Sequence, residues 1–433
     1  MTPAARLAAA IEVFAAIESE RRPAADALKA WGLSHRFAGS GDRSAIAGIV
    51  YDALRRRASS AYLMGVDTPR AIILGMLKRE RGLDTETIAK LADGSRYAPA
   101  ALTGDERGHL DAADINDAPP YVQGDYPEWL DPHFSRAFGE VRGEEGAALA
   151  SRAPLDLRVN TLKAERDTVT AMLSDLKPEP TRWSPCGLRL RLSADAKSPA
   201  IHAEPAYLKG FIEVQDEGSQ LAALFSGARP GEQVIDLCAG AGGKTLVLAA
   251  MMQNKGQIFA TDDDKRRLAP IHDRLKRSGA RNVQVRTPKS IGGEIADLAG
   301  RMDLVLIDAP CTGTGAWRRN PDAKWRMRPG ALEQRQKEQA EILDRAVPLL
   351  KARGRIAYVT CSILEEENGA QVRAFLTRHP DFSVHAPAEV IEPLGERAFM
   401  FGKAARLSGG GLLMSPRTTD TDGFYVSVMR RDG

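Results

Sequence analysis

The sequence predicts an α/β protein in which a doubly wound sheet forms the C-terminal half, preceded by a small α+β domain and an all-helical domain. Three patterns support this prediction. Apolar residues recur at helical spacing in the first hundred residues, polar and apolar residues alternate in two runs between 155 and 192, and apolar runs alternate with helical segments after Gly231. A chain of 433 residues has room for two or three domains.

The first predicted unit is a helical domain at residues 1–118. Its pattern runs from Ala4 to about Leu91. Apolar side chains lie three or four residues apart, the spacing of a buried helix face, in two stretches: Leu7, Ile11, Phe14, Ile17 and then Ile46, Ile49, Val50, Leu54. Asp42 or Ser44 is the expected N-cap of the second helix.

A proline-rich segment at 114–132 has little periodicity and predicts a connection across the surface. After it, residues 155–160 and 188–192 alternate between polar and apolar, which predicts two strands, and 166–176 has the pattern of a helix. We therefore place an α+β subdomain, with its linker, at residues 119–230.

The third predicted unit is the doubly wound domain at 231–433. Its five expected strands are the apolar runs 234–237, 258–261, 283–285, 304–307 and 356–359. Strands that are buried on both faces lose the in-and-out alternation, so continuous apolar runs between helices favour a parallel sheet. Ligands of such sheets bind at the carboxyl ends of the strands, where the candidate site residues are therefore expected.

Composition excludes several classes of protein. With 60 Lys and Arg against 57 Asp and Glu, the net charge is only +3, so nucleic-acid binding would need local basic patches. The four cysteines, Cys186, Cys238, Cys311 and Cys361, form neither a CxxC pair nor a Cys/His cluster. We expect no disulfide framework and no metal site, in a reduced chain where a thiol is free for catalysis.

The N-terminal segment does not have the pattern of a signal peptide or a membrane span. Its apolar stretch from Leu7 is interrupted by Glu12 and Glu18. The expected location is the cytoplasm, with no membrane partner, and the expected state is a monomer.

A glycine-rich turn follows the first predicted strand, at residues 236–245. Glycines let the backbone approach a ligand closely, and Asp262, 22 residues after Gly240, stands where a carboxylate would accept hydrogen bonds from ribose hydroxyls. These features indicate a nucleoside cofactor, although a tight turn with a solvated Asp is an alternative. A phosphate-binding Walker A loop is disfavoured, because Cys238 stands where that pattern needs glycine.

Two cysteines follow the fourth and fifth predicted strands, in Asp308-Ala309-Pro310-Cys311 and Thr360-Cys361-Ser362. Either cysteine alone would be interpreted as a small buried residue. As a pair beside a strand-end Asp they favour nucleophilic chemistry, because a thiolate attacks a ring carbon readily.

Four segments stand in a characteristic order: 236–245, then 308–311, then 360–362 with Glu366-Glu367-Asn368, and finally Asp422-Gly423-Phe424-Tyr425. Together they resemble the motifs of RNA 5-methylcytosine methyltransferases of the RsmB (Sun/Fmu) type. The resemblance extends upstream to 155–163. Through its helix pattern, Gly41-Asp42-Arg43 and Val50-Tyr51, the first domain resembles the NusB-like RNA-binding module of that family.

The resemblance implies S-adenosylmethionine as cofactor in a Rossmann-like domain. The implied cofactor-binding residues are the loop Cys238, Ala239, Gly240, Ala241, Gly242, Gly243 and Lys244, with Asp262 on the ribose and Arg267 and Asp308 nearby. The resemblance also implies that Cys361 adds to C6 of cytosine, that Asp308 contacts the base, and that Cys311 assists release of the product.

The sequence departs from the family pattern in two places. Ala241 replaces the usual proline, which is expected to loosen the turn, and Arg286-Thr287-Pro288-Lys289 stand where an acidic residue usually contacts the adenine. Both departures concern the affinity for the cofactor.

RNA contact is predicted at residues 317–328, which interleave two aromatic side chains with five cations and include Arg318, Arg319, Lys324 and Trp325. Residues 55–57, and Lys276-Arg277 with Arg281, are further candidates, for which a solvated charged face is an equal alternative. A base in a duplex cannot present C6 to a thiolate, so the target would be single-stranded or flipped out.

The leading prediction is an RNA cytosine-C5 methyltransferase acting on ribosomal RNA. Transfer RNA is the alternative substrate. Two other classes remain: an inactive RNA-binding assembly factor, which the presence of both Cys311 and Cys361 disfavours, and an adenine N-methyltransferase, whose usual motif after the fourth strand differs from residues 308–311.

Overall fold

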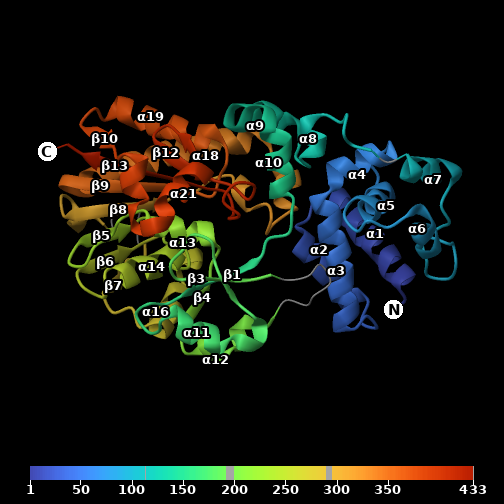
Figure 1. Cartoon of the computed structure of the whole chain (residues 1–433), viewed down its shortest axis with the longest axis horizontal. Coiled ribbons are helices and arrows are strands. Elements are labelled where there is room, and N and C mark those ends of the chain that lie inside the picture. Colours follow the sequence, from blue (N-terminus) through green and yellow to red (C-terminus); the bar gives the residue numbers. More distant parts are fainter. Residues whose placement is uncertain (113, 192–198, 289–294, 433) are drawn as a thin grey trace. The chain divides into compact units, whose positions relative to one another are not determined.

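The computed structural model describes residues 1–112, 114–191, 199–288 and 295–432 (Figure 1). The described chain forms two compact units. The first consists of Met1–Arg152 together with Trp317–Arg328, and the second contains the remaining described residues. The first unit is thus longer than the predicted helical domain 1–118 and includes a piece of the predicted sheet domain.

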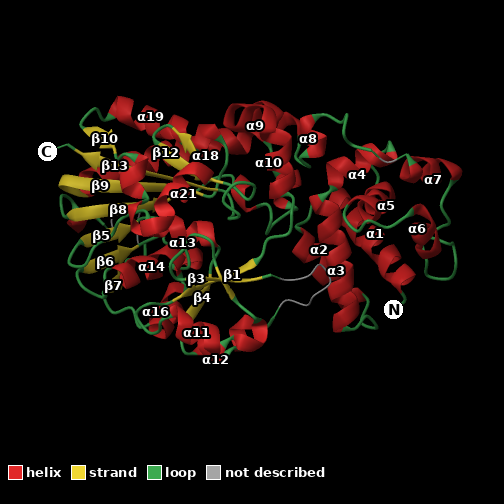
Figure 2. Cartoon of the chain, in the orientation of Figure 1, coloured by secondary structure: helices red, strands yellow, loops and turns green. Residues whose placement is uncertain are grey.

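The first unit contains only helices in its described residues (Figure 2). They are α1 (Pro3–Glu20), α2 (Ala24–Ser34), α3 (Ser40–Arg55), α4 (Arg57–Met64), α5 (Pro69–Arg79), α6 (Thr85–Leu91), α7 (Gly104–Asp111), α8 (Pro120–Gln123), α9 (Asp131–Phe138), α10 (Arg142–Leu149) and α17 (Ala323–Arg326). The two apolar stretches lie in α1 and α3 and enter one core, as predicted. The predicted N-cap is wrong, because α3 starts after Gly39, and Asp42 in its first turn pairs with Arg6 at 2.8 Å.

The proline-rich segment forms α8 and a single 3-10 turn before α9, where a surface connection was predicted. The buried Tyr126 of this segment explains the difference, because it packs on Phe134 of α9. Tyr126 and Phe134 are buried and stack with their ring centroids 4.0 Å apart, and Phe134 also stacks on Trp317 at 5.9 Å. The segment therefore belongs to the core of the helical unit.

Residues 317–328, which we call the strap, join the helical unit although they follow the fourth parallel strand in the chain. Lys324 is 1% exposed, and its ammonium group donates to the backbone carbonyls of Arg55 at 2.9 Å and Asp125 at 2.6 Å. The Arg55 guanidinium donates to the carbonyl of Arg318 at 2.6 Å. These bonds satisfy backbone acceptors that would otherwise be buried without partners.

Lys324→Ala is expected to destabilise the protein by about 2–4 kcal/mol, because two buried carbonyls lose their donor and the aliphatic stem leaves a cavity. The free energy of unfolding, measured in urea, tests this. Lys29→Ala is a control, since that exposed lysine should change stability by less than about 0.5 kcal/mol. Equal effects of the two substitutions would contradict the structural role of Lys324.

The second unit begins with a small α+β sheet in the strand order β2-β3-β1-β4. Its elements are β1 (Leu155–Val159), α11 (Arg166–Met172), β2 (Glu179–Pro180), β3 (Gly187–Leu190), α12 (Pro205–Leu208), β4 (Ile212–Val214) and α13 (Glu217–Leu224). β1 and β3 are the two alternating runs and pair antiparallel, and α11 is the predicted helix. Leu192, the end of the second predicted run, lies outside the described residues.

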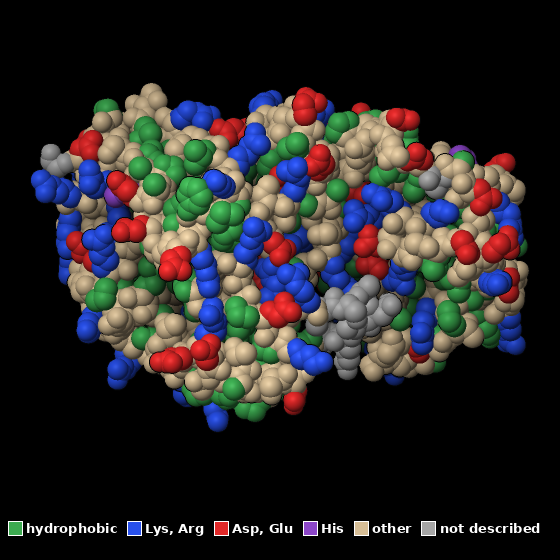
Figure 3. Space-filling model, in the orientation of Figure 1, with side chains coloured by type: hydrophobic (Ala, Val, Ile, Leu, Met, Phe, Trp, Pro, Cys, Tyr) green, Lys and Arg blue, Asp and Glu red, His purple; other side chains and the backbone are tan. Residues whose placement is uncertain are grey.

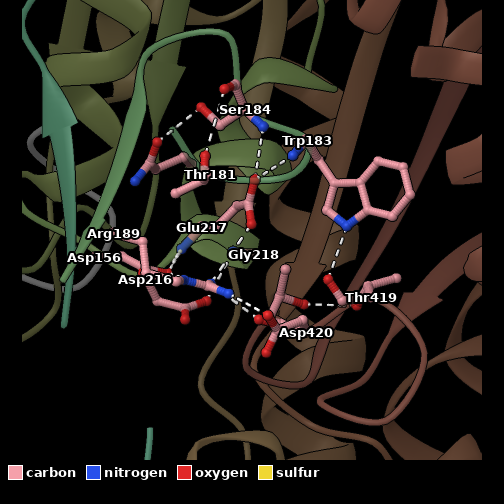
Figure 4. Close-up of polar contacts among 12 residues, drawn as sticks. Asp156, Thr181, Trp183, Ser184, Arg189, Asp216, Glu217, Gly218, Thr419 and Asp420 are labelled. Carbon is pink, nitrogen blue, oxygen red and sulfur yellow. Dashed lines mark hydrogen bonds and ion pairs between the residues drawn. The ribbon is translucent and has the colours of Figure 1, made fainter. Parts of the chain in front are cut away.

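The polar face of this small sheet is buried rather than solvated (Figure 4). The Arg189 guanidinium donates to the Asp156 carboxylate at 2.7 and 2.8 Å and to the Asp420 carboxylate at 2.5 Å. The Glu217 carboxylate accepts from the backbone N–H groups of Trp183 and Ser184 at 2.6 and 2.7 Å. This network fastens β1 and β3 to α13 and to the segment before the last strand.

The large sheet has the strand order β11-β12-β13-β9-β8-β5-β6-β7, with β10 paired to β13. The strands are β5 (Gln233–Asp236), β6 (Gln257–Ala260), β7 (Val283–Val285), β8 (Met302–Asp308), β9 (Leu350–Thr360), β10 (Phe382–Val384), β11 (Arg406–Ser408), β12 (Gly411–Met414) and β13 (Phe424–Arg431). The helices are α14 (Gly243–Met251), α15 (Lys265–Leu268), α16 (Ile271–Ser278), α18 (Pro329–Ala346), α19 (Gly369–Arg378), α20 (Pro387–Val390) and α21 (Ala398–Ala404). β5 to β9 are the five predicted parallel strands, and β10 to β13 extend the sheet antiparallel.

Both faces of the central parallel strands are covered, which explains their continuous apolar runs, whereas the edge strand β7 carries the exposed Gln284. In β8, Leu304 and Leu306 enter a core with α13 and α14, whereas the intervening Val305 points to the other face and is buried as well. The sheet is therefore doubly wound, with its carboxyl edge formed by the ends of β5, β6, β8 and β9.

Charges of both signs are interspersed over the visible surface (Figure 3), in keeping with the small net charge. None of the described helices is long and apolar enough to cross a membrane. Within the described ranges, no three His, Cys, Asp or Glu side chains group as metal ligands.

Candidate active site

The glycine-rich turn connects β5 to α14 at the carboxyl edge of the sheet. Gly240 and Gly242 have φ of 48° and 85°, in the left-handed region that favours glycine. A Cβ on Gly242 would lie 2.5 Å from the Ile271 side chain, so glycine is required there on steric grounds also. The turn leads into the N-terminus of α14, whose free N–H groups favour a polar or anionic ligand.

Asp262 follows β6 and fixes this turn. Its buried carboxylate accepts from the backbone N–H of Gly240 at 2.9 Å and from that of Asp264 at 2.9 Å. Each oxygen keeps a further lone pair for a ligand hydroxyl. Arg267 is 58% exposed, and its guanidinium lies 3.7 Å from the same carboxylate.

Arg274 on α16 supports the turn in a way that the sequence did not indicate. Its guanidinium donates to the carbonyl of Ala241 at 2.9 Å and to the Glu213 carboxylate at 2.9 and 3.2 Å. The turn that carries alanine in place of proline is thus held by a charged side chain. A helical arginine with no motif around it gave no signal for this role.

Lys244, in the first turn of α14, reaches the end of β8. Its ammonium group donates to the Asp308 carboxylate at 2.7 Å and lies 5.1 Å from the ring centroid of Phe424. Burial alone lowers the pKa of Lys244. The negative charge of Asp308, and after it Cys361, raise this pKa by more than burial lowers it. The net shift is upward, so the lysine stays charged. A fixed cation therefore lies near Cys361.

Cys311 and Cys361 meet, as the sequence predicts. Their Sγ atoms lie 3.3 Å apart, and both residues are half-buried. The hydrogen bond with Cys361, together with burial and the nearby Glu367, raises the pKa of the Cys311 thiol. Cys311 is therefore the partner that keeps its proton, and it is placed to donate a hydrogen bond to a thiolate at Cys361.

Cys238 is a third thiol near this edge of the sheet, but its surroundings differ. Burial and then the carboxylates of Asp236 and Asp308 raise the pKa of the Cys238 thiol. With no cation among these causes, this thiol is disfavoured as a nucleophile.

The loops that carry the two cysteines are bonded to each other. The backbone N–H of Gly315 donates to the carbonyl of Cys361 at 2.9 Å, and the Thr314 and Ser362 hydroxyls lie 3.0 Å apart. Glu367 is fully buried and accepts from the backbone N–H of Thr312 at 2.8 Å. Glu367 therefore fixes Thr312, the residue that follows Cys311. The sequence motif included Glu367 but did not indicate this role.

The C-terminal motif supports the same loops. The backbone N–H of Gly423 donates to the carbonyl of Gly315 at 2.9 Å. A Cβ on Gly315 would lie 2.0 Å from the Gly423 carbonyl oxygen, so two glycines are needed where these segments cross. Gly423 therefore acts on the site through the backbone.

The structure corrects part of the predicted RNA contact. The side chains of Arg318 and Lys324 are buried in the helical unit, so neither is available to a phosphate. Lys324 donates to the carbonyl of Arg55, and the carbonyl of Arg318 accepts from the Arg55 guanidinium. Arg319 and Trp325 are partly exposed. After β7, Arg286 pairs with Asp297 at 3.1 Å, and Lys289 lies outside the described residues.

The site fits the cofactor that the sequence motifs imply. Asp236, Asp262 and Asp308 are grouped around the glycine turn, and the Asp236 Oδ1 atom is buried with no hydrogen-bond partner. Burial raises the pKa of Asp236 to about 7. The Asp262 and Asp308 carboxylates at this edge complement a positively charged sulfonium and amine.

Comparisons with known proteins identify the family. Residues 224–430 match the family described as 16S rRNA methyltransferase RsmB/F, and residues 126–197 match its ferredoxin-like domain. The chain is 30% identical over 376 residues to a probable ribosomal RNA small subunit methyltransferase B of Synechocystis, covering 86% of this chain and 80% of that protein. It is 36% identical to the enzyme of that name from Citrobacter koseri, over 70% of this chain and 66% of that protein.

Solved structures show the same architecture. The crystal structure of PH0851 superposes on this chain with a TM-score of 0.70 and 25% sequence identity. The match covers 100% of this chain and 99% of the PH0851 chain. A methyltransferase homologue from Pyrococcus horikoshii covers 72% of this chain and 97% of its own, with a TM-score of 0.57 and 26% identity.

The fold and the site together define a Rossmann-like methyltransferase that uses S-adenosylmethionine. The two matching family models lie in two of the three predicted domains, the α+β subdomain and the doubly wound domain. The chain belongs to the RsmB/F family of 16S rRNA methyltransferases.

Proposed function

We propose that the protein methylates C5 of a cytosine in ribosomal RNA through a covalent bond between Cys361 and C6 of the base. The observation that carries this proposal is the pair of thiols 3.3 Å apart beside the Lys244–Asp308 ion pair. C5 of cytosine is a poor nucleophile until a thiolate adds at C6 and pushes electron density onto it.

Each residue then has a chemical task. Lys244 stabilises the Cys361 thiolate, which adds to C6 of the cytosine, and Asp308 hydrogen-bonds the base. S-adenosylmethionine, when bound, would supply the methyl group that C5 accepts, and its sulfonium would become the neutral thioether of S-adenosylhomocysteine. A base then removes the C5 proton, the electron pair restores the C5–C6 double bond, and the Cys361 thiolate leaves. Cys311 assists this last step by donating to the departing sulfur.

Release of tritium tests the position of methylation. RNA made with [5-³H]cytosine should lose one tritium to water for each methyl group transferred, because the C5 hydrogen is replaced. Ribosomal and transfer RNA are compared in parallel, and faster release from ribosomal RNA is expected. Methyl transfer without tritium release would contradict C5 as the target.

Asp262→Ala is expected to weaken binding of S-adenosylmethionine by about 1–3 kcal/mol, because hydrogen bonds to the ribose and the clamp on Gly240 are lost together. Calorimetric titration measures the change. Asp263→Ala is the matched control, since that side chain is 68% exposed and pairs with Arg345. Unchanged affinity in Asp262→Ala would rule out a role in cofactor binding.

A further inference from the structure

The two thiols of the active site are close enough to react with each other. The Sγ atoms of Cys311 and Cys361 lie 3.3 Å apart, and a disulfide bond is about 2.05 Å long, so the sulfurs need to approach by only about 1.2 Å. All four cysteines lie in the described parts of the chain, and this is the pair that is in contact, whereas the Cys186 thiol contacts the Ser184 hydroxyl. A two-electron oxidation would therefore join Cys311 to Cys361.

The backbone around both cysteines is already held in place. The backbone N–H of Gly315 donates to the carbonyl of Cys361 at 2.9 Å, and the hydroxyls of Thr314 and Ser362 lie 3.0 Å apart. The two loops are thus bonded to each other next to the thiols, so the sulfurs can approach by rotation of their side chains. Because the fold has brought both groups together in advance, their reaction has the high effective concentration of an intramolecular step.

The two thiols differ in the way that a stepwise oxidation requires. Both residues are half-buried, which leaves part of each open to a small oxidant. The charged Lys244 interacts electrostatically with Cys361, and a nearby cation favours the thiolate, which is the form that peroxides oxidise. The hydrogen bond with Cys361 and burial raise the pKa of the Cys311 thiol, so this partner keeps its proton. Cys361 is therefore oxidised first, and Cys311 reacts second.

We propose that Cys311 and Cys361 form a redox switch, in which hydrogen peroxide converts Cys361 to a sulfenic acid and Cys311 converts that acid to a disulfide. The disulfide removes the nucleophile, so it stops methyl transfer until a thiol reductant restores both cysteines. This effect on catalysis rests on the proposed function, whereas formation of the disulfide does not. The disulfide also protects Cys361 from oxidation to a sulfinic acid, which thiols do not reverse.

The oxidation proceeds in two steps. The Cys361 thiolate attacks one oxygen of the peroxide, the O–O bond breaks, and the hydroxide that leaves takes up a proton to become water. The Cys311 sulfur then gives up its proton and attacks the Cys361 sulfur, the S–O bond breaks, and the second hydroxide leaves with that proton as water. The two thiols lose two electrons, and the peroxide that accepts them becomes two water molecules. Dithiothreitol reverses the oxidation by thiol–disulfide exchange.

Peptide mapping tests the switch in the full chain, without cofactor or RNA. The protein is treated with a small molar excess of hydrogen peroxide, alkylated and digested. Two of the four thiols should be lost, with Cys311 and Cys361 in one cross-linked peptide and with Cys186 and Cys238 alkylated. Methyl transfer should fall in proportion to the cross-linked fraction and return after dithiothreitol. A cross-link to Cys186 or Cys238, or a sulfinic acid at Cys361 with no cross-link, would overturn the proposal.

Cys311→Ala separates the two steps, and its readout is mass rather than activity. Peroxide should leave Cys361 as a sulfenic acid that dimedone traps and that passes on to the sulfinic acid, with no recovery after dithiothreitol. Cys311→Ser serves the same purpose if the alanine variant is unstable. Cys186→Ala is the matched control and should cross-link like the wild type. Full recovery of the Cys361 thiol in Cys311→Ala would show that Cys311 has no part in the protection.

The switch and the proposed function can fail separately. If peroxide forms the cross-link but the reduced protein releases no tritium from C5, only the proposed function fails. If the reduced protein releases tritium but peroxide forms no cross-link, only the switch fails. Fully cross-linked protein that methylates RNA at the rate of the reduced protein would also overturn the switch.

Discussion

Cys361→Ala is expected to lower methyl transfer by a factor on the order of 10⁴ or more, as is typical when the nucleophile of a covalent mechanism is removed. Affinity for S-adenosylmethionine should stay unchanged, because the glycine turn and Asp262 do not depend on this thiol. Transfer of labelled methyl groups to RNA measures the rate, and calorimetric titration measures the affinity.

Cys186→Ala is the matched control for this result. Cys186 is also half-buried, but it lies in the turn before β3 of the small sheet, where its thiol contacts the Ser184 hydroxyl at 3.6 Å. It should retain nearly full activity. Turnover by Cys361→Ala close to the wild-type rate would disprove the nucleophilic role.

Cys311→Ala should accumulate a covalent complex between protein and RNA. The attack by Cys361 does not need the second thiol, but release does, because Cys311 is the group that keeps its proton at 3.3 Å from the reacting sulfur. Incubation with substrate RNA and cofactor should give a nuclease-sensitive band that survives denaturing electrophoresis. The double variant Cys311→Ala/Cys361→Ala should give none.

The opposite pattern would reverse the assignment. A stable complex in Cys361→Ala, with none in Cys311→Ala, would make Cys311 the nucleophile. Both sulfurs reach one point at the sheet edge, so their distance alone does not choose between them. The choice rests on the resemblance of Thr360-Cys361-Ser362 to the family motif, and the electrostatic interaction of Lys244 with Cys361 supports it.

The parallel strands could be predicted from the sequence because burial on both faces leaves a local signal. The runs of β5, β6, β8 and β9 are apolar and each precedes a helix, whereas the short edge run 283–285 contains the exposed Gln284. The antiparallel extension is different, because β13 pairs with β9 across more than sixty residues and nothing in either segment specifies the partner. The residues at the strand ends were therefore found. The motif around Gly423 was found as well, but neither its antiparallel pairing nor its contact with Gly315 could be predicted.

The strap shows the limit of composition as a guide. Lys324 and Arg318 have the residue types of an RNA contact, but the partner of Lys324 is a pair of carbonyls about 200 and 270 positions earlier in the chain. The positive charge of Lys324 led to the prediction that its side chain is exposed. The side chain is buried because backbone carbonyls elsewhere in the helical unit need a hydrogen-bond donor. Arg274 was missed, and the role of Glu367 was not indicated by its motif, for the related reason that both roles depend on distant segments.

The strap also determines how this protein can be divided. A fragment ending at Arg152 would lack residues 317–328, so the carbonyls of Arg55 and Asp125 would have no donor and the Phe134 ring would lose the indole that covers it. A fragment that begins after Arg152 would keep residues 317–328 without the helices that they pack against, so Trp317 and Trp325 would be exposed to water. Gene fusions, deletions or exchanges that treat the N-terminal region as an independent module should therefore yield insoluble products unless the twelve-residue insertion travels with it.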